Sequence, residues 1–473
     1  MQEEFGAAYI NKLRDAYPEL PGRADFCVYW FYKAHRHLKK DCYAGLVGTN
    51  TITQNYSREG SLDYIVNNGG EIFNAYSSMN WSGEAAVFVS IACWKKGKFD
   101  TEKILYTYID GELQKNNADE INSSLSLNID LTGSIVLECN KKPKRVFQGQ
   151  THGHEGFLLE TNVAKKIIKE NKRYFEVLKP YLNGEEMVSN INCQPSRFVI
   201  DFTFKDILEA STFDKVFSNI SKTVLQERQT KAIEQKSENE KLILQNPKAK
   251  VNKHHINFYN KWWKLSYGRE DLMNNMKEVH RYIACSQTLL RPIFEFISTE
   301  ISPSQSLYYF GFEDYYSFGI IQSIFHWEWV KARGATLGDT YRYNSSFVWD
   351  TFPWPQTPTE TQIKKVAATA KALHTARTQA MQAHNMSLRD LYRLLEQPGT
   401  NTIKDLHFAL DKTVMEAYGF NTKEDILKQL LQLNLQVADK ESHKEKVQPP
   451  GLPDFVKNKE EYVSDDCVRF EWG

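Results

Sequence analysis

The sequence has no excess of charge of either sign, no paired cysteines and no long apolar run. Lysine plus arginine number 59, and aspartate plus glutamate also number 59, so the formal net charge is zero. A nucleic-acid binder of this composition must therefore gather its positive charge locally. The seven cysteines stand singly, without a Cys-x-x-Cys pair, which argues against both a disulfide framework and a thiolate zinc site.

Signals for export or membrane insertion are also missing. The start, Met1-Gln2-Glu3-Glu4, is not basic, and no apolar core follows it. No apolar run approaches the roughly 18 residues that span a bilayer. The histidines, including His152, His154, His254 and His255, lack a companion acid or thiol at metal-ligand spacing, so we expect no metal site. We expect a cytoplasmic protein with free thiols.

What the sequence does have is length and aromatic side chains. Its 473 residues exceed one compact core and indicate two or three domains. Aromatic residues make up 13%, which suits stacking surfaces as well as hydrophobic cores.

The first hundred residues alternate between helical and strand patterns, which is typical of an open α/β sheet. The run Ala44–Asn50 is apolar with a polar end, as in a buried parallel strand that places functional groups at its carboxyl end. The turn-like Lys95–Lys98 could fold one strand back onto the next. Strands are predicted at 44–50, 71–76, 85–94 and 104–109, and helices at 26–38, with an aromatic buried face, and at 61–68.

The rest of the chain changes character twice. The basic cluster of Lys141, Lys142, Lys144 and Arg145 marks a boundary near residue 140, after which the pattern is irregular and mixes α and β. Within it, 226–255 is polar and charged, which indicates either a solvated helix plus loop or a phosphate-facing arm. From about 357 to 438 the chain is helical, and the polar tail 439–473 is expected to be loosely ordered.

Three helices are predicted in that C-terminal part. Thr357, with Pro358 and Glu360, should cap the first helix, and Ser387 with Asp390 should begin the second. Gly419 should end the third.

A series of short motifs, in order along nearly the whole chain, resembles large bacterial DNA adenine-N6 methyltransferases of the MmeI-like class, which serve restriction–modification and phage defence. No single motif is decisive, but their order and spacing together are specific. They are Thr49–Gln54 with Arg58-Glu59, Trp81–Val87, Phe147–Gly149 with Gly156-Phe157, Pro180–Gly184, Phe198–Phe202, Glu227–Gln229, Trp262-Trp263, Ser323 with His326-Trp327, Arg342-Tyr343, Thr351–Pro355, and the C-terminal pairs Ser387-Leu388, Leu391-Tyr392, Leu406-His407, Leu410-Asp411 and Ala417–Gly419.

The resemblance implies a fold and a division of labour. Residues 1–140 would be the tail of a Rossmann-like methyltransferase domain in the α/β class, 141–356 a mixed α+β target-recognition domain, 357–438 a helical C-terminal domain and 439–473 a polar tail. It also implies double-stranded DNA as a partner and S-adenosylmethionine as the cofactor.

The departures from the family pattern concern the cofactor side. Family members bind S-adenosylmethionine through a glycine-rich segment and transfer the methyl group with an Asn-Pro-Pro-Tyr or Asn-Pro-Pro-Phe tetrapeptide. This sequence has neither, and its only Pro-Pro pair is Pro449-Pro450 after Gln448. Neither Gly45 and Gly48 nor Gly69 and Gly70 make a nucleoside cradle. The nuclease module of some relatives is missing too. We therefore expect no complete catalytic site, and a chain that begins just after the tetrapeptide.

The resemblance assigns roles on the adenine side. In these enzymes an aromatic residue stacks on the adenine that is flipped out of the duplex, and Trp81 occupies that place. Asn50, at a strand's carboxyl tip, with Gln54 and Arg58 in the adjoining loop, would form the substrate pocket, where Arg58 could hold a phosphate. Alternatively, Trp81 plugs the sheet edge, and the other three cap the next helix or are solvated. Asp25 is interpreted as a helix N-cap.

DNA contacts are predicted for Lys144, Arg145, Arg228 and Arg342. Arg342 stands between two tyrosines, a setting that suits a guanidinium near a groove edge. The alternative for each is an ordinary solvated charge. His326-Trp327 and Phe352–Pro355 are interpreted as structural.

Four functions fit these observations. The leading hypothesis is the DNA-recognising C-terminal half of a site-specific adenine methyltransferase, either partnered by a separate N-terminal half or truncated. The alternatives are a stand-alone DNA-binding specificity module, a protein-binding scaffold of a defence system, and an autonomous enzyme with a cryptic cofactor site.

Overall fold

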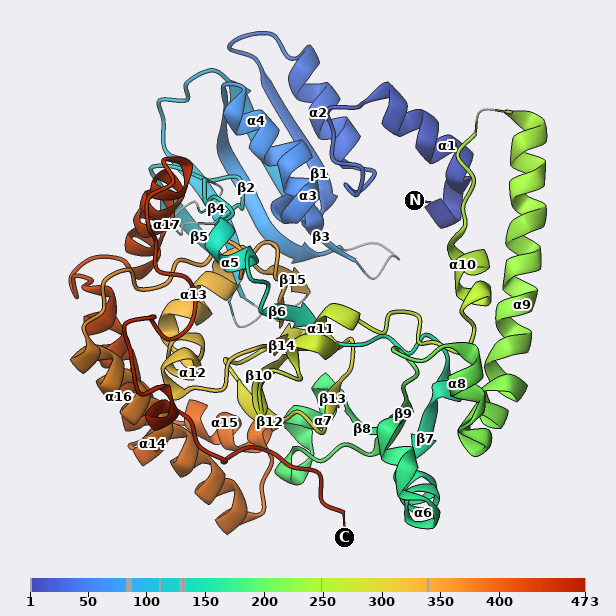
Figure 1. The fold of residues 1–473 in the computed structure, drawn as a ribbon. Coiled ribbons are helices and arrows are strands. Elements are labelled where there is room, and N and C mark those ends of the chain that lie inside the picture. The colour runs from blue at the N-terminus through green and yellow to red at the C-terminus, as the bar shows by residue number, and fades with distance from the viewer. Residues whose placement is uncertain are drawn as a thin grey trace. The chain divides into compact units, whose positions relative to one another are not determined.

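The computed structural model describes residues 2–81, 87–109, 112–126, 131, 133–247, 249–337 and 340–472. The chain forms two compact units (Figure 1). Unit 1 contains Met1–Ile135 and Lys331–Arg342, and unit 2 contains Val136–Val330 and Tyr343–Gly473. No helix of the described residues is both long and apolar enough to cross a bilayer.

Unit 1 is built on a five-stranded mixed sheet in the order β1-β3-β2-β4-β5. Its strands are β1 (Tyr43–Thr49), β2 (Gly70–Asn80), β3 (Phe88–Lys96), β4 (Lys103–Ile109) and β5 (Glu112–Ala118), and a hairpin of β15 (Ala335–Leu337) and β16 (Thr340–Arg342) belongs to the same unit. Its helices are α1 (Gln2–Ala16), α2 (Val28–His37), the 3-10 turn η1 (Asn50–Thr53), α3 (Asn55–Arg58), the π-turn η2 (Glu59–Asp63) and α4 (Tyr64–Asn67).

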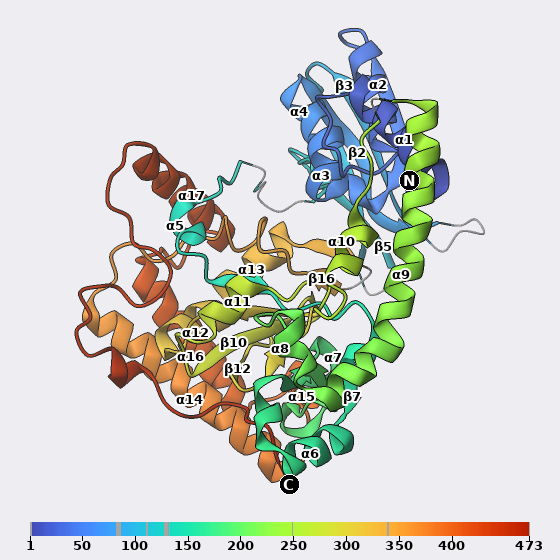
Figure 2. The same ribbon diagram turned by 45° about the vertical axis from the view of Figure 1, so that its right-hand side comes forward.

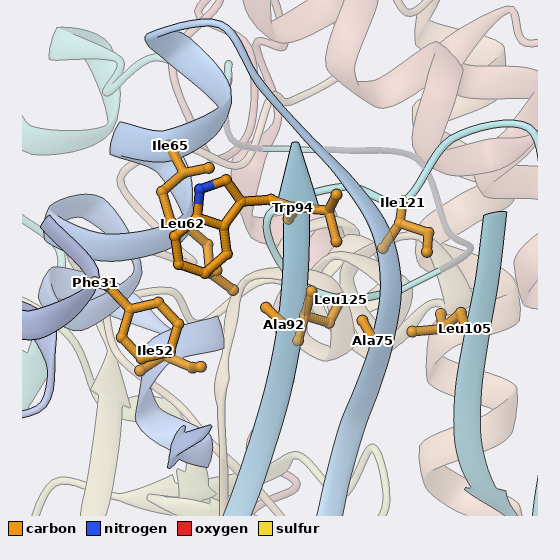
Figure 3. Packing of buried hydrophobic residues seen from close by; sticks show 11 residues of the cluster. Phe31, Ile52, Leu62, Ile65, Ala75, Ala92, Trp94, Leu105, Ile121 and Leu125 are labelled. Carbon is orange, nitrogen blue, oxygen red and sulfur yellow. The ribbon is translucent and has the colours of Figure 1, made fainter. Parts of the chain in front are cut away.

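Helices α2 and α4 and the turns η1 and η2 pack on the sheet through one apolar cluster (Figure 3), while Leu13 of α1 packs against a second cluster around Tyr29 and Tyr32. Phe31 of α2 stacks on Trp94 of β3 with their ring centroids 5.9 Å apart. Ile52, Leu62 and Ile65 lie with Phe31 beside Trp94, and Leu125 and Ile121 lie beside Ala75 of β2 and Leu105 of β4 in the same cluster. The buried aromatic residues of α2 are Tyr29, Phe31 and Tyr32. The predicted face of Phe26, Tyr29 and Trp30 is therefore only partly right, since Trp30 is 55% exposed.

Two strand predictions for this sheet are wrong in their pairing. The run 44–50 forms β1, but β1 is antiparallel to β3, and Tyr43 and Val47 are exposed, so it is not a buried parallel strand. The turn at Lys95–Lys98 does not fold β3 onto β4, because β3 already lies between β1 and β2, and β4 pairs with β2 and β5 instead. Residues 85 and 86 of the predicted strand 85–94 lie outside the described residues.

Unit 2 contains two four-stranded sheets, in the orders β12-β10-β14-β6 and β13-β8-β9-β7. The first joins β6 (Val146–Gln148), β10 (Arg281–Ser286), β12 (Glu295–Ser298) and β14 (Leu307–Phe310), and the second joins β7 (Leu158–Glu160), β8 (Leu178–Leu182), β9 (Arg197–Ile200) and β13 (Ser302–Pro303); β11 (Thr288–Leu289) is a further short strand. Around them lie α5 (Glu138–Lys141), η3 (Glu155–Phe157), α6 (Thr161–Glu170), η4 (Lys172–Glu176), α7 (Gly184–Ser189), η5 (Ile191–Cys193), α8 (Ile207–Ser211), α11 (Glu270–Asn275), α12 (Tyr315–Gln322) and α13 (Ile324–Arg333).

A long helix, α9 (Asp214–Gln245), runs beside the short α10 (His254–Asn260) in both views (Figures 1 and 2). The charged stretch 226–255 consists of the second half of α9, the loop that follows it and the start of α10. The helix-plus-loop interpretation is therefore confirmed for the described residues, which do not include Lys248. The phosphate-facing role of this stretch stays a prediction.

The C-terminal helices of unit 2 are α14 (Glu360–His384), α15 (Leu388–Glu396), α16 (Thr402–Tyr418) and α17 (Ile426–Ser442). Ser387 caps α15 and Gly419 ends α16 in the left-handed conformation (φ 68°), as predicted. The cap of α14 is Thr359, which forms a capping box with Gln362, so the prediction of Thr357 is wrong. One turn, η6 (Lys459–Tyr462), follows in the tail.

The tail is ordered, contrary to the expectation from its polarity. The backbone of Val468 exchanges hydrogen bonds with Phe296 and Ser298 at the edge of β12. Val456, Tyr462 and Phe470 are 3–6% exposed. Widely spaced apolar side chains, rather than a periodic pattern, therefore fasten this segment to unit 2.

Candidate nucleic-acid interface

The carboxyl ends of β1 and β2 lie at the same edge of the sheet of unit 1. Thr49 of β1 and Met79 of β2 both pair with Val89 of β3. Asn50 and Trp81 therefore leave this edge on either side of the start of β3, about 10 Å apart, since neighbouring strands are about 4.8 Å apart. The fold thus brings together two residues that the sequence analysis placed in one pocket.

Trp81 follows the last residue of β2, and its backbone N–H donates to the carbonyl of Val87 at 2.9 Å. Its side chain is 46% exposed, so much of the indole is open to solvent. The rest of the Trp81–Val87 motif, residues 82–86, lies outside the described residues. Stacking on a base stays a prediction, which this exposure permits.

Asn50 is half-buried at the start of η1, and its side chain makes no hydrogen bond with the described residues. The two residues that flank Asn50, Thr49 and Thr51, are both held by the carboxylate of Asp25. Asp25 accepts hydrogen bonds from the hydroxyls of Thr49 at 2.8 Å and Thr51 at 3.2 Å, while the Asp25 N–H donates to Ser57 Oγ at 2.9 Å. An amide with open hydrogen-bonding capacity is therefore held on a rigid turn.

Asp25 is a functional candidate that the sequence analysis missed. It does not cap α2, since Cys27 stands at the N-cap position and caps with no side-chain bond. The signal in the sequence was the pair of threonines around Asn50, which need an acceptor when they turn inward.

Arg58 has a partner within the protein. Its Nε lies 3.4 Å from Asp63 Oδ2, and both side chains are 12% exposed. Glu59–Asp63 is a π-turn, which brings residues five apart onto one face. Gln54 accepts the Arg58 N–H through its backbone carbonyl. A phosphate role for Arg58 stays a prediction, and it would require the arginine to exchange Asp63 for the ligand.

The glycines of this sheet do not fit a cradle for S-adenosylmethionine. A Cβ on Gly45 would lie 3.0 Å from Cys93 Sγ, and one on Gly48 would lie 2.8 Å from Ile52 and 3.0 Å from Phe31. The space beside Gly48 is filled by Ile52 and Phe31 of the core, and the space beside Gly45 by Cys93, so both glycines serve packing within the protein.

Lys144 and Arg145 lie on the segment leading into β6 of unit 2. The Lys144 Nζ lies 3.0 Å from Asp271 Oδ2 and 4.5 Å from the Phe147 ring centroid. Arg145 lies over Phe312 at 5.4 Å and donates weakly to the carbonyl of Gly311 at 3.4 Å. Lys144 is exposed and its pair is of the surface kind that a phosphate can replace.

Arg228 of α9 is buried, with 7% of its surface exposed. Its guanidinium donates to the carbonyls of Trp262 at 3.2 Å and Lys264 at 2.7 Å, and to Ser266 Oγ at 3.2 Å. Burial lowers the pKa of Arg228 to about 10. A direct DNA contact stays a prediction; in this structure Arg228 holds the loop after α10.

Arg342 ends β16, and its exposed side chain makes no hydrogen bond or ion pair with the described residues. The neighbouring Tyr343 is fully buried, with its hydroxyl 3.1 Å from His326 Nε2. Burial lowers the pKa of His326 to about 4, so this histidine is neutral at pH 7 and structural. Arg342 therefore has an exposed guanidinium without a partner among the described residues, and the next residue in the chain, Tyr343, is buried and held in place.

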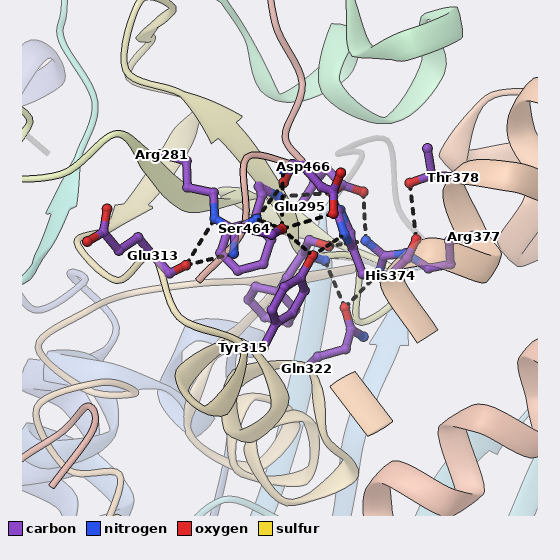
Figure 4. Close-up of polar contacts among 12 residues, drawn as sticks. Arg281, Glu295, Glu313, Tyr315, Gln322, His374, Arg377, Thr378, Ser464 and Asp466 are labelled. Carbon is purple, nitrogen blue, oxygen red and sulfur yellow. Dashed lines mark hydrogen bonds and ion pairs between the residues drawn. The ribbon is translucent and has the colours of Figure 1, made fainter. Parts of the chain in front are cut away.

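A buried ionic cluster in unit 2 was not foreseen (Figure 4). Glu295 of β12 lies 2.6 Å from both His374 Nε2 and Arg377 Nη2 of α14. Burial by itself would raise the pKa of Glu295, but the charges of Arg377 and His374 outweigh it and lower that pKa to about 2. The cluster fastens the sheet β12-β10-β14-β6 to helix α14. Among the described residues, no group of three or more His, Cys, Asp or Glu side chains could hold a metal ion.

Two segments of the chain match known protein families. A family description for the MmeI DNA-methyltransferase domain matches residues 7–107, and one for the MmeI target recognition domain matches residues 292–356. DNA methyltransferase A of Bacillus subtilis (strain 168) is 23% identical over 427 residues, covering 88% of this chain and 44% of that protein.

Among solved structures, the Type IIL restriction-modification enzyme MmeI in complex with DNA has the same fold. It superimposes with a TM-score of 0.73 at 22% sequence identity, covering 92% of this chain and 55% of that one. The chain therefore spans about half the length of these two proteins.

Proposed function

Because this chain is an MmeI-like protein with a methyltransferase domain and a target recognition domain, we propose that it is the DNA-recognising part of a site-specific DNA adenine-N6 methyltransferase of a restriction–modification or phage-defence system. In this proposal 1–140 carries the adenine side of the methyltransferase domain, 141–356 recognises the target, 357–438 is a helical domain, and 439–473 fastens the chain end.

The shared edge of β1 and β2 is the observation that carries the proposal. Methylation of adenine N6 requires the base to leave the duplex and lie in a pocket. The exposed Trp81 ring can stack on one face of that base, which contributes about 1–3 kcal/mol. The Asn50 amide can both donate to and accept from the base edge. Asp25 holds the turn on which this amide sits.

The methyl donor side comes from residues beyond these 473. The methyltransferase domain implies S-adenosylmethionine, but the filled glycine positions do not fit it, and the sequence holds no Asn-Pro-Pro-aromatic tetrapeptide. A longer protein or a separate N-terminal half would supply these parts.

The duplex would be bound through cations of both units, with Arg342 in the β15-β16 hairpin of unit 1 and Lys144 and Arg145 in unit 2. Arg342 is suited to a base edge or a phosphate because its guanidinium has no partner among the described residues. Lys144 and Arg145 are suited to phosphates, which position the protein without reading sequence.

Selection from a random pool of duplexes tests this function. The chain should enrich a short motif that contains at least one adenine, and binding should weaken steeply with salt. The chain alone should bind S-adenosylmethionine no tighter than about millimolar and should transfer no label to DNA. If no motif is enriched at low salt, the recognition role is rejected. If the chain alone transfers label to DNA, the claim that its S-adenosylmethionine site is incomplete is rejected.

A stand-alone DNA-binding specificity module is the second candidate, favoured by the same filled glycine positions. It would bind its motif without flipping a base. Permanganate oxidation of the thymine opposite each adenine of the enriched motif separates the two functions, because extrusion of an adenine leaves its partner thymine unpaired and reactive.

A further inference from the structure

The loop between α10 and α11 in unit 2 lines an open pocket of about 690 Å³. This volume falls within the roughly 300–1,000 Å³ of small-molecule sites. Its wall combines cations, amides and aromatic rings, contributed by Lys261, Arg269, Asn257, Asn260, Phe258 and Tyr267. The sequence motifs assigned no role to Arg269 or Tyr267.

Arg269 is held in an unusual conformation at this wall. Its backbone is left-handed (φ 56°, ψ 60°), which non-glycine residues seldom adopt and which often marks a functional position. Its Nη2 donates to Gln148 Oε1 at 3.3 Å. Its Nε is buried and has no hydrogen-bond partner among the described residues. The unpaired Nε is costly but enclosed, so an incoming acceptor would bind the Nη groups of this guanidinium.

Tyr267 supplies a half-exposed aromatic ring, and the guanidinium of Arg269 lies over one of its faces. Its side chain is 47% exposed, and its ring centroid lies 5.3 Å from the Arg269 guanidinium carbon and 5.8 Å from the Phe258 centroid. Lys261 adds an exposed ammonium that makes no ion pair with the described residues. Two acids line the pocket, Glu270 and Asp271. The charge of Asp271 is balanced by Lys144, so Glu270 is the acid that opposes the cations of the pocket.

The pocket wall is fixed from behind by Arg228. Besides Trp262, Lys264 and Ser266, its guanidinium reaches the carbonyl of Lys261 at 3.4 Å. It also lies between the rings of Phe157 and Phe258, at 5.2 and 5.5 Å. Arg228 is therefore a positioning residue for the loop that carries Lys261 and leads to Tyr267.

We propose that this pocket binds a nucleotide, with the base against Tyr267 and the phosphate on Arg269 and Lys261. Aromatic stacking with a nearby cation is the chemistry by which proteins hold single nucleotides. The nucleotide can come from two sources: the DNA beside the recognition sequence, or a free nucleoside monophosphate. The DNA source rests on the proposed function, whereas the free nucleotide does not.

Four variants test the pocket. Arg269→Asn removes the guanidinium but keeps a residue that tolerates the left-handed conformation, so its melting temperature should be unchanged or higher. Tyr267→Ala removes the ring and Tyr267→Phe keeps it. Arg393→Asn, at an exposed arginine of α15, is the matched control for loss of one charge. Each variant is titrated with duplex DNA by fluorescence polarisation and with dAMP by calorimetry.

The DNA source predicts about tenfold weaker duplex binding for Arg269→Asn and Tyr267→Ala, near-normal binding for Tyr267→Phe and Arg393→Asn, and no dAMP binding. The free-nucleotide source predicts dAMP binding by the unmodified chain that both pocket variants lose, with duplex affinity unchanged. If the pocket variants match Arg393→Asn in both assays, the pocket proposal is overturned while the proposed function stands. If the unmodified chain binds dAMP but no duplex, the proposed function fails and the pocket stands.

Discussion

Thr49 at the end of β1 and Met79 near the end of β2 pair with the same residue of β3, Val89. Because β3 runs antiparallel to both strands, the chain leaves this edge of the sheet twice, once into Asn50 and once into Trp81. These two residues are far apart in sequence, and only the return of β3 between β1 and β2 brings them together. Their placement does not depend on a methyl donor, so the adenine side of the site can be tested on this chain by itself.

Replacing Trp81 should impair base extrusion more than duplex binding. Trp81→Ala removes the ring that would stack on the flipped adenine, a loss of about 1–3 kcal/mol. Permanganate oxidation of the thymine opposite the target adenine, which reports extrusion whether or not the flipped base is stacked, should fall by about tenfold, while Trp81→Phe should retain most of it. Equal signals for the unmodified chain and Trp81→Ala would leave Trp81 as a plug of the sheet edge.

Removing the Asp25 carboxylate should loosen the turn around Asn50. Asp25→Ala deprives two threonine hydroxyls and the Phe26 N–H of their acceptor, which should lower the free energy of unfolding by about 1–3 kcal/mol. Urea unfolding of unit 1 measures this loss. Thr51→Val removes the longer of the two hydroxyl contacts to Asp25 and the 2.7 Å contact between the Thr49 and Thr51 hydroxyls, but it leaves Asp25 bound to Thr49 and to the Phe26 N–H, so it should cost less. A larger loss from Thr51→Val than from Asp25→Ala would contradict the role given to Asp25.

Strands β1 to β4 and helix α2 could be predicted from local patterns, but β5, α1 and the pairing of the strands could not. The apolar run 44–50 predicts a strand, yet its neighbour is β3, which comes later in the chain, so the antiparallel pairing is a long-range property. The same limit applies to Asp25, whose partners are two threonines beyond the next helix. Arg228 resembled a surface charge because α9 is mostly polar, and only the folded loop at Trp262–Ser266 shows that its guanidinium is enclosed.

Order in the C-terminal tail escaped prediction for a different reason. Val456, Tyr462 and Phe470 are buried, but polar residues separate them and they follow neither the helix nor the strand period. The ionic cluster of Glu295 likewise has no sequence signature, since its members lie in separate elements that meet only after folding.

Arg342 should contribute one cation to DNA binding. Arg342→Ala should weaken binding to the enriched motif and reduce the slope of log affinity against log salt by about 1. Arg342→Lys keeps the charge but loses the two-pronged geometry, so relaxed preference at one base pair in this variant would indicate base reading rather than phosphate contact. Arg393→Asn serves as the control, and a salt slope for Arg342→Ala equal to that of the unmodified chain would exclude the contact.

Breaking the Glu295 cluster from one side should be severely destabilising. Arg377→Met leaves the Glu295 carboxylate buried with one charged partner fewer, which should cost about 3–5 kcal/mol in the free energy of unfolding. The double variant with Glu295→Gln should cost less than the two single losses added together, because it removes the stranded charge as well. Additive losses, measured by urea unfolding, would mean that the two side chains do not depend on each other.

Asp411 of α16 should make stability fall as the pH rises from about 4 to 6. Burial raises the pKa of Asp411 to about 6 although its carboxylate accepts the Ile324 N–H at 2.8 Å. The folded chain therefore holds this proton more tightly than the unfolded chain, whose carboxyl has an ordinary pKa of 3.8. The proton therefore stabilises the folded chain fully when the pH is below the unfolded pKa of 3.8, and this stabilisation is lost as the pH rises through the folded pKa of about 6.

Asp411→Asn keeps the accepting oxygen without the charge, so at pH 7 it should be more stable than the unmodified chain by about 1–3 kcal/mol, and the difference should vanish near pH 3.5. A difference that does not change between pH 3.5 and 7 would contradict this account, because a purely steric effect of the amide has no pH dependence.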